Sequence, residues 1–204
     1  MNTPRRAATA AAAVLVLAGT LGACTSGGSN DPTPVPSSSS PSASSSPTQS
    51  PADTASNAAL ATWKAYMEAQ NTASRDASVS LAELAKYATA PALTQAQQSV
   101  QGIRDKGYIS AGDVRVDSAR TSQFSTVSDP STTPPTYPSI HVTGCYDSVD
   151  VTLVDATGKS VQIPNRQTYF DYDATVVNAN YPDTSGWRVT ELTAKAVASC
   201  ASSS

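Results

Sequence analysis

The sequence lacks the side chains that metal centres usually require. It contains one histidine, His141, and three cysteines among 204 residues. A zinc site of the usual kind needs several cysteine or histidine ligands, so one histidine cannot build a multi-histidine centre. Asp147, Asp150 and Asp155 lie close together in the sequence, but the glycine and terminal glutamate of a calcium-binding loop are missing. We therefore expect no metal site, and we expect no cofactor.

Clusters of basic residues are also missing. The chain carries 13 basic and 16 acidic residues, and its five lysines are scattered. Because nucleic-acid-binding surfaces depend on clustered Lys and Arg, we expect no nucleic-acid partner. The tripeptide Gly158-Lys159-Ser160 looks like the end of a phosphate-binding loop, but the first glycine of that motif is replaced by Leu153 and no helix is expected to follow.

The apolar stretch at the N-terminus is too short to cross a membrane. Residues 7–18 supply about a dozen mostly apolar residues, whereas a membrane-spanning helix needs about 20. Arg5 and Arg6 precede this stretch and small residues follow it, which is the arrangement of an export signal. We expect residues 1–23 to be a cleaved signal peptide.

The segment Leu21-Gly22-Ala23-Cys24 resembles the lipobox of bacterial lipoproteins at every position. The resemblance implies cleavage before Cys24, attachment of diacylglycerol with palmitate-type acyl chains to its thiol, and anchoring at the extracytoplasmic face of the cell membrane. Two acyl chains suffice for stable anchoring. The alternative is an ordinary secretory signal that happens to be followed by an unmodified cysteine.

Residues 24–51 form a linker after the lipidated cysteine, and residues 52–204 form one domain. Between Thr25 and Pro51 there are 11 Ser, 6 Pro and 3 Thr among 27 residues, a composition that cannot bury enough apolar surface to order itself. The remaining segment of about 150 residues suits a single domain with its own core. After removal of the signal peptide the chain has 11 basic and 16 acidic residues, a net charge of −5.

The apolar pattern of the domain changes once, near residue 110. Helical spacing predicts about three helices before that point, over residues 54–70, over a short segment opened by the capping box Ser80–Glu83, and over residues 91–106. Alternation then predicts four strands, over residues 113–127, 140–154, 161–177 and 187–198. Helices followed by an antiparallel sheet predict an α+β fold.

Two cysteines remain if Cys24 is lipidated, and an exported chain favours a disulfide between Cys145 and Cys200. Alternation along the expected strands places both thiols on inward faces with Val149 and Leu192, respectively. Two separate buried thiols are the alternative.

Several segments together resemble a known fold family: 84–89, 91–93, 107, 114–116, 144–148, 155–159, 186–189 and Cys200. They are similar to uncharacterised lipoproteins of high-GC Gram-positive bacteria with a nuclear-transport-factor-2-like (cystatin-like) domain. The resemblance implies about three helices packed on a curved four-stranded antiparallel sheet, with a conical cavity between them. It does not specify an activity, because folds of this kind host enzymes and binding modules alike.

Candidate cavity residues are Tyr169, Asp171 and Asp173, together with His141. In enzymes of the resembled fold, such as polyketide cyclases and ketosteroid isomerases, an acidic or histidine base acts with a phenolic or acidic donor. Phe170 and Tyr172 alternate with the two aspartates, however, and period two places these aromatic residues in the core and the aspartates outside. We therefore assign no catalytic residue.

Two hypotheses about function follow. The first is a membrane-anchored binding or interaction module of the cell envelope, whose partner is an envelope protein or a small apolar ligand. The alternative is a small-molecule enzyme of the cyclase or isomerase type. The position of Asp171, Asp173 and His141 relative to the cavity distinguishes the two hypotheses.

Overall fold

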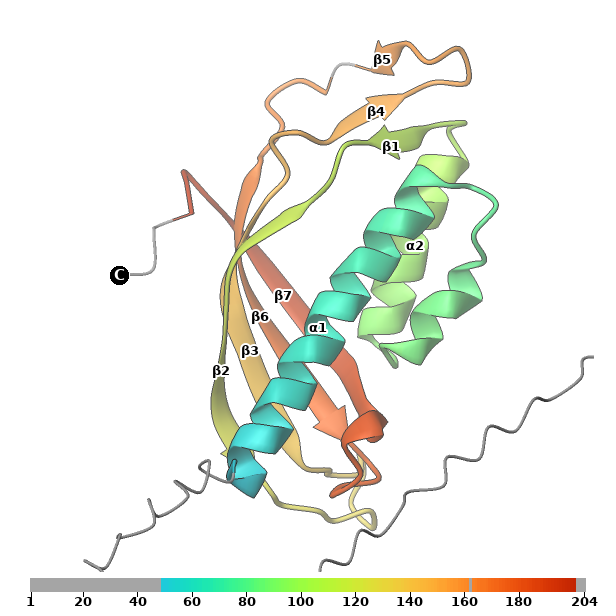
Figure 1. Ribbon diagram of the computed structural model, residues 1–204. Helices are drawn as coiled ribbons and strands as arrows, with labels where there is room; N and C mark the ends of the chain where they lie inside the picture. The colour runs from blue at the N-terminus through green and yellow to red at the C-terminus, as the bar shows by residue number, and fades with distance from the viewer. Residues whose placement is uncertain (1–48, 162, 201–204) are drawn as a thin grey trace, which may run out of the picture. The chain divides into compact units, whose positions relative to one another are not determined.

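The computed structural model describes residues 49–161 and 163–200 (Figure 1). The chain divides into two units, residues 1–45 and 46–204, and every described residue belongs to the second. The expected signal peptide, Cys24 and most of the expected linker lie outside the described residues. Among the helices of the described part, none is both long and apolar enough to cross a membrane.

Helix α1 (Pro51–Arg75) begins earlier and ends later than the apolar pattern predicts. The Ser50 side chain accepts a hydrogen bond from the Asp53 amide, and Pro51 occupies the first turn, where its missing N–H costs nothing. Pro51, which the sequence composition assigns to the linker, is therefore the first residue of the helix.

Two further helical segments follow as predicted. The 3₁₀ helix η1 (Leu81–Lys86) is capped by Ser80, whose hydroxyl accepts a hydrogen bond from the Ala82 amide. Helix α2 (Ala92–Arg104) is followed by Gly107, which has a φ of 71°. A left-handed conformation of this kind favours glycine after a helix.

The strands form two antiparallel sheets. The larger sheet has the order β2-β3-β6-β7, with β2 (Arg115–Ser125), β3 (Ser139–Asp147), β6 (Tyr169–Asn178) and β7 (Trp187–Val197). The smaller sheet has the order β1-β4-β5, with β1 (Ile109–Ala111), β4 (Thr152–Val154) and β5 (Ser160–Val161). A short 3₁₀ helix η2 (Thr184–Gly186) precedes β7.

The α+β class is confirmed, but two details of the expected sheet are wrong. The four-stranded sheet is not strongly curled (Figure 1). The long strands expected over 140–154 and 161–177 are each interrupted, because the chain leaves the large sheet after Asp147 and returns at Tyr169. The Arg166 guanidinium donates hydrogen bonds to the carbonyls of Ser148 and Val151, and this holds the two crossing segments together.

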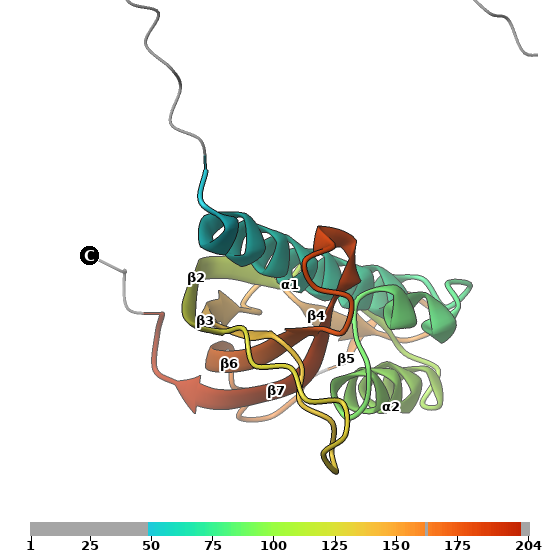
Figure 2. The same ribbon diagram turned by 90° about the horizontal axis from the view of Figure 1, so that it is seen from below.

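The hydrophobic core lies between α1, α2 and the inner face of the large sheet (Figures 1 and 2). Trp63 from α1 and Trp187 from β7 are fully buried there. The Tyr172 hydroxyl on β6 accepts a hydrogen bond from Trp63 Nε1 at 3.1 Å and donates one to the Ser118 carbonyl at 2.9 Å. A Cβ on Gly144 would lie 2.8 Å from that hydroxyl and 1.9 Å from the Ser118 carbonyl oxygen, so this close packing requires glycine at position 144.

A candidate ligand-binding cavity

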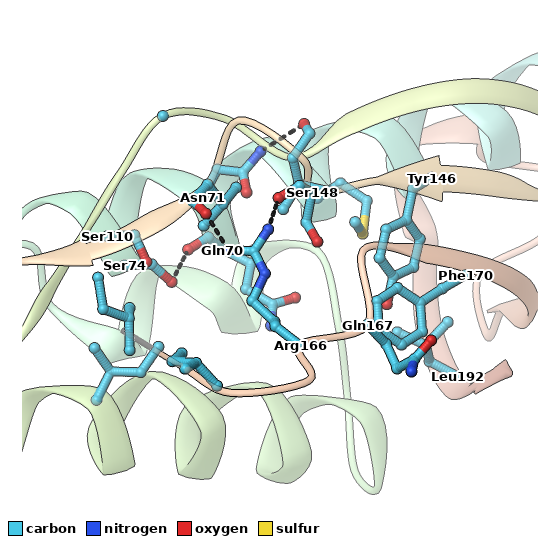
Figure 3. Close-up of a pocket in the computed structure, with 17 residues that line it drawn as sticks. Gln70, Asn71, Ser74, Ser110, Tyr146, Ser148, Arg166, Gln167, Phe170 and Leu192 are labelled. Carbon is cyan, nitrogen blue, oxygen red and sulfur yellow. Dashed lines mark hydrogen bonds between the residues drawn. The ribbon is translucent and has the colours of Figure 1, made fainter. Parts of the chain in front are cut away.

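A cavity of about 370 Å³ lies between the C-terminal half of α1, the small sheet, and the end of the large sheet where β3 ends and β6 begins (Figure 3). Its lining comes from α1, the end of α2, both sheets and the segment 163–167. The lining residues are Met67, Gln70, Asn71, Ser74, Ile103, Ser110, Gly112, Val114, Tyr146, Ser148, Val151, Leu153, Ile163, Arg166, Gln167, Phe170 and Leu192.

An aromatic stack connects the cavity to the core. Tyr146 and Phe170 line the cavity and stack with ring centroids 5.2 Å apart and planes 23° apart. Tyr146 also stacks on Tyr172 at 6.1 Å, and Tyr172 stacks on Trp63 at 4.5 Å. Because each ring is held by the next, this wall of the cavity is preorganised and apolar.

Three of the polar side chains that line the cavity, Gln70, Asn71 and Ser74, come from α1. Asn71 Nδ2 donates to the Val114 carbonyl at 3.2 Å, and the Ser74 hydroxyl donates to the Gln70 carbonyl at 2.9 Å. Within the described part of the chain, the side-chain amides of Gln70 and Gln167 make no hydrogen bond. These two amides are available to a ligand as both donors and acceptors.

The single charged side chain in the lining is already engaged. Arg166 Nη1 donates to the Val151 carbonyl and Nη2 to the Ser148 carbonyl (Figure 3). Among the described lining residues there is no carboxylate, histidine or thiol. The cavity therefore offers mainly apolar contact and hydrogen bonds, together with the positive charge of one guanidinium that two backbone carbonyls hold in place.

Burial keeps the nearby phenols neutral. It raises the pKa of Tyr146, and it raises the pKa of Tyr172 and of Tyr66 to about 12. For Tyr172 the hydrogen bond from Trp63 opposes this effect, but desolvation dominates. Near neutral pH, Tyr146 at the cavity therefore carries its proton and can donate a hydrogen bond.

The structure places the sequence-based candidates on the other face of the sheet. His141 Nδ1 and Asp173 Oδ1 are 3.0 Å apart, and the side chains are 33% and 52% exposed. Asp171 is exposed and Tyr169 is half-buried. These four residues share the outer face in the strand register, and none lines the cavity. Phe170 and Tyr172 take the inward positions, as period two predicts.

Cys145 and Cys200 form a disulfide, with their Cα atoms 5.6 Å apart. The expectation that Cys145 points inward is wrong. The inner face of β3 is formed by Ile140, Val142, Gly144 and Tyr146, so Cys145 lies on the outer face. It is buried there, at 4% exposure, because the C-terminal segment passes from β7 over β6 to reach it.

Sequence reasoning missed the cavity residues. The apolar stripe Leu60, Trp63 and Met67 continues along α1 into Asn71 and Ser74, which share the inward face at helical spacing. The change from apolar to polar residues along the inward face of one helix was the sequence signal that could have indicated a cavity there. The contribution of Arg166 and Gln167 had no such signal, because it depends on the path taken by the segment between the two sheets.

Comparisons with known proteins do not identify the chain. No protein-family model and no curated protein matches it. A solved structure, the intermembrane space region of the chloroplast protein ARC6, is similar with a TM-score of 0.47 and 12% sequence identity, covering 70% of this chain and 97% of that one. Among residues 49–161 and 163–200, no three His, Cys, Asp or Glu side chains lie together as metal ligands would.

Proposed function

We propose that this chain is a membrane-anchored extracytoplasmic lipoprotein whose α+β domain binds a small, largely apolar ligand. The observation that carries the proposal is the cavity beside Tyr146 and Phe170. Its volume of about 370 Å³ falls within the range of about 300–1,000 Å³ that is typical of small-molecule sites.

The chemistry of the lining supports a largely apolar ligand that carries a polar group. The Arg166 guanidinium donates to two backbone carbonyls, which fixes its position and leaves its other N–H groups to a polar group of the ligand. The apolar side chains of Met67, Leu153 and Phe170 favour an aliphatic or ring-containing body. The amides of Gln70 and Gln167 and the Tyr146 hydroxyl suit a hydroxyl, ester or amide group on that body.

Binding fits this cavity better than catalysis of the cyclase or isomerase type. Such an enzyme needs a base within hydrogen-bond reach of its substrate. The candidate bases Asp171, Asp173 and His141 lie on the outer face of the sheet, on the opposite side from the cavity. The cavity therefore lacks the base that the alternative enzymatic function requires.

The lipobox-like segment supports the anchoring part of the proposal. Leu21 to Cys24 follows a charged start and a short apolar stretch, and the Ser/Pro-rich linker leads directly to the capped start of α1. Helices on one face of an antiparallel sheet, enclosing a cavity, also support membership of the nuclear-transport-factor-2-like lipoproteins.

Occupancy of the cavity can be tested on protein extracted from membranes. Native mass spectrometry should detect a bound apolar molecule on the wild-type chain. Ser74→Trp, which places a large ring in the cavity, should reduce the bound fraction at least about tenfold by filling the site. Ala61→Trp is the matched control, because Ala61 is exposed on the same helix. Equal loss in both variants, or ligand retained in Ser74→Trp, would contradict the proposal.

The anchor requires a separate test. Cys24→Ala should move the protein from the membrane fraction to the soluble fraction, and the mature wild-type chain should carry the mass of a diacylglyceryl group. A Cys24→Ala chain that still sediments with membranes, or a mature chain without acyl mass, would refute lipid anchoring.

A further inference from the structure

Strand β7 forms an open edge of the large sheet. Its only strand neighbour in the described part of the chain is β6. The beginning of β7 is covered, since the Val189 amide donates to the Tyr87 carbonyl at 2.8 Å and the Thr89 amide donates to the Val189 carbonyl at 2.9 Å. Beyond Val189, no described residue outside β6 shares a backbone hydrogen bond with this strand.

The uncovered part of β7 is exposed on both faces as well as along its edge. Glu191, Thr193, Ala194, Lys195 and Ala196 are all exposed. Ala194 and Ala196 stand opposite Tyr172 and Phe170 in the register, so they belong to the inner face, yet neither helix covers them. In Figure 2 the C-terminal half of β7, which ends in the red arrowhead, extends beyond α2.

The sequence of this edge is self-complementary about Thr193. Glu191 and Lys195 stand two positions before and two positions after Thr193, and all three share the outer face of the sheet. In an antiparallel pair with a two-fold axis at Thr193, position 193 + k faces position 193 − k. Glu191 of each copy would then face Lys195 of the other, and Leu192 would face Ala194.

We propose that two copies of this chain pair antiparallel through β7, with the two-fold axis at Thr193, to form a continuous eight-stranded sheet. The dimer would contain two Glu191–Lys195 pairs. It would cover Ala194 and Ala196, and it would bring Leu192, a residue of the cavity lining, to the interface.

Charge pattern favours a second copy over a solvated edge. Natural proteins protect open edges with charged side chains, but charges of one sign would repel a second copy in every register. Here the two charges are opposite and equally spaced about the centre. Within the described residues neither Glu191 nor Lys195 forms an ion pair. Lys195 stands opposite Asp171 in the register but forms no ion pair with it, so both charges can pair with a second copy.

Zero-length crosslinking of the full chain in membranes tests the pairing. A carbodiimide joins a carboxylate to an amine that it contacts, and residues 191 and 195 of one strand are about 13 Å apart. A Glu191–Lys195 crosslink must therefore join two chains. We expect a covalent dimer whose yield falls at least about tenfold in Glu191→Gln, and no such fall in Glu83→Gln, which removes an exposed carboxylate on η1.

Charge reversal tests the same pairing without a chemical crosslinker. Glu191→Lys should raise the dimer dissociation constant about tenfold, since it creates two Lys–Lys contacts per dimer, and Glu191→Lys combined with Lys195→Glu should restore it to within about threefold. Circular dichroism checks that each variant is folded. In addition, Thr193→Cys should form a disulfide-linked dimer on oxidation, whereas Lys195→Cys should not.

Three results would overturn the proposal. The first is a monomeric wild-type chain in the extracted state at concentrations of about 100 μM, which would mark the charges as protection of a solvated edge. The second is a dimer that is unchanged by Glu191→Lys. The third is a crosslink from Glu191 to a different protein, which would identify the edge as a site for another partner.

Discussion

At the scale of single residues, Tyr172 connects the core to the cavity. Its ring stacks between Trp63 and Tyr146, and its hydroxyl joins Trp63 Nε1 to the Ser118 carbonyl. The residue is 3% exposed. Removing the hydroxyl would leave both of its hydrogen-bond partners unsatisfied in a buried site.

Tyr172→Phe should lower the free energy of unfolding by about 1–3 kcal/mol, the usual cost of orphaned buried polar groups. Chemical denaturation monitored by circular dichroism gives this value. Tyr169→Phe is the control, because Tyr169 is half-buried on the outer face and its hydroxyl has no hydrogen bond among the described residues; it should change stability by less than about 0.5 kcal/mol. Equal losses of stability in the two variants would contradict the proposed contribution of the Tyr172 hydroxyl.

The buried phenols predict alkaline instability. Burial raises the pKa of Tyr66 and Tyr172 to about 12 in the folded state, above the usual tyrosine value of about 10. Above about pH 10 these tyrosines lose their proton in the unfolded state but keep it in the folded state. Their contribution to the free energy of unfolding is therefore complete below about pH 10 and is lost as the pH rises to about 12, on the order of 2 kcal/mol for each residue. Melting temperature measured across this window should fall while tyrosinate absorbance rises with unfolding. A melting temperature that is constant from pH 10 to 12 would contradict this.

At the scale of elements, Arg104 on α2 closes the end of α1. Its Nη2 atom donates to the carbonyls of Ala73, Asp76 and Val79 at 2.7, 3.0 and 2.9 Å. These carbonyls lie at the end of α1 and in the segment after it, where carbonyl groups lack partners within the helix. One guanidinium therefore joins the end of α2 to the end of α1 and to the segment that follows it.

Arg104→Met should reduce stability by about 1.5–3 kcal/mol, because hydrogen bonds from a charged group are lost while the carbonyls stay partly buried. Arg120→Met is the control, since Arg120 is exposed and makes no hydrogen bond in the described part of the chain. Thermal denaturation of the two variants makes the comparison. A loss in Arg104→Met no larger than that in Arg120→Met would show that the carbonyls are satisfied by water.

Elements with a long pattern were predictable from the sequence, and the short ones were not. Apolar spacing and the Ser80 cap predicted the helices, and alternation predicted the aspartates of β6 on the outer face. Strands of two or three residues, such as β1, have no measurable period. The position of β1 depends on Gly112, where a Cβ would lie 2.1 Å from the Asp150 carbonyl oxygen, and a contact between such distant segments leaves no local signal.

The resemblance predicts a cavity, but the residues that line it were unpredictable for a related reason. Its lining depends on where the chain leaves the large sheet after Asp147 and on the hydrogen bonds of Arg166 to two carbonyls. Both are tertiary features. The disulfide was predictable from the number of cysteines and the export signal. The face of the sheet on which it lies was not, because a shift of one residue in the pairing of β3 moves each of its side chains to the other face.

At the scale of the whole molecule, the Cys145–Cys200 disulfide holds the C-terminal segment across the outer face. The bond spans 55 residues and ties the last strand of the sheet to β3. The cavity lies on the inner face and the disulfide on the outer one, so the bond stabilises the sheet without contributing to the cavity.

Replacing both Cys145 and Cys200 by alanine should lower the free energy of unfolding by about 4 kcal/mol, the chain-entropy value for a loop of this length. Denaturation of the oxidised wild type, the reduced wild type and the double variant measures the effect. The reduced protein serves as the control and should match the double variant. A difference below about 1 kcal/mol between oxidised protein and the double variant would contradict this role.

The central claim is that the cavity, and not the acidic outer face, is the functional site. Octanol, an uncharged apolar probe with one hydroxyl, can be titrated into the labelled protein while its nuclear magnetic resonance spectrum is recorded. We predict saturable shifts in the methyl groups of Met67, Ile103 and Leu153, which line the cavity, and their loss in Ser74→Trp. Shifts confined to His141, Asp171 and Asp173, or no saturable shift at all, would contradict the account.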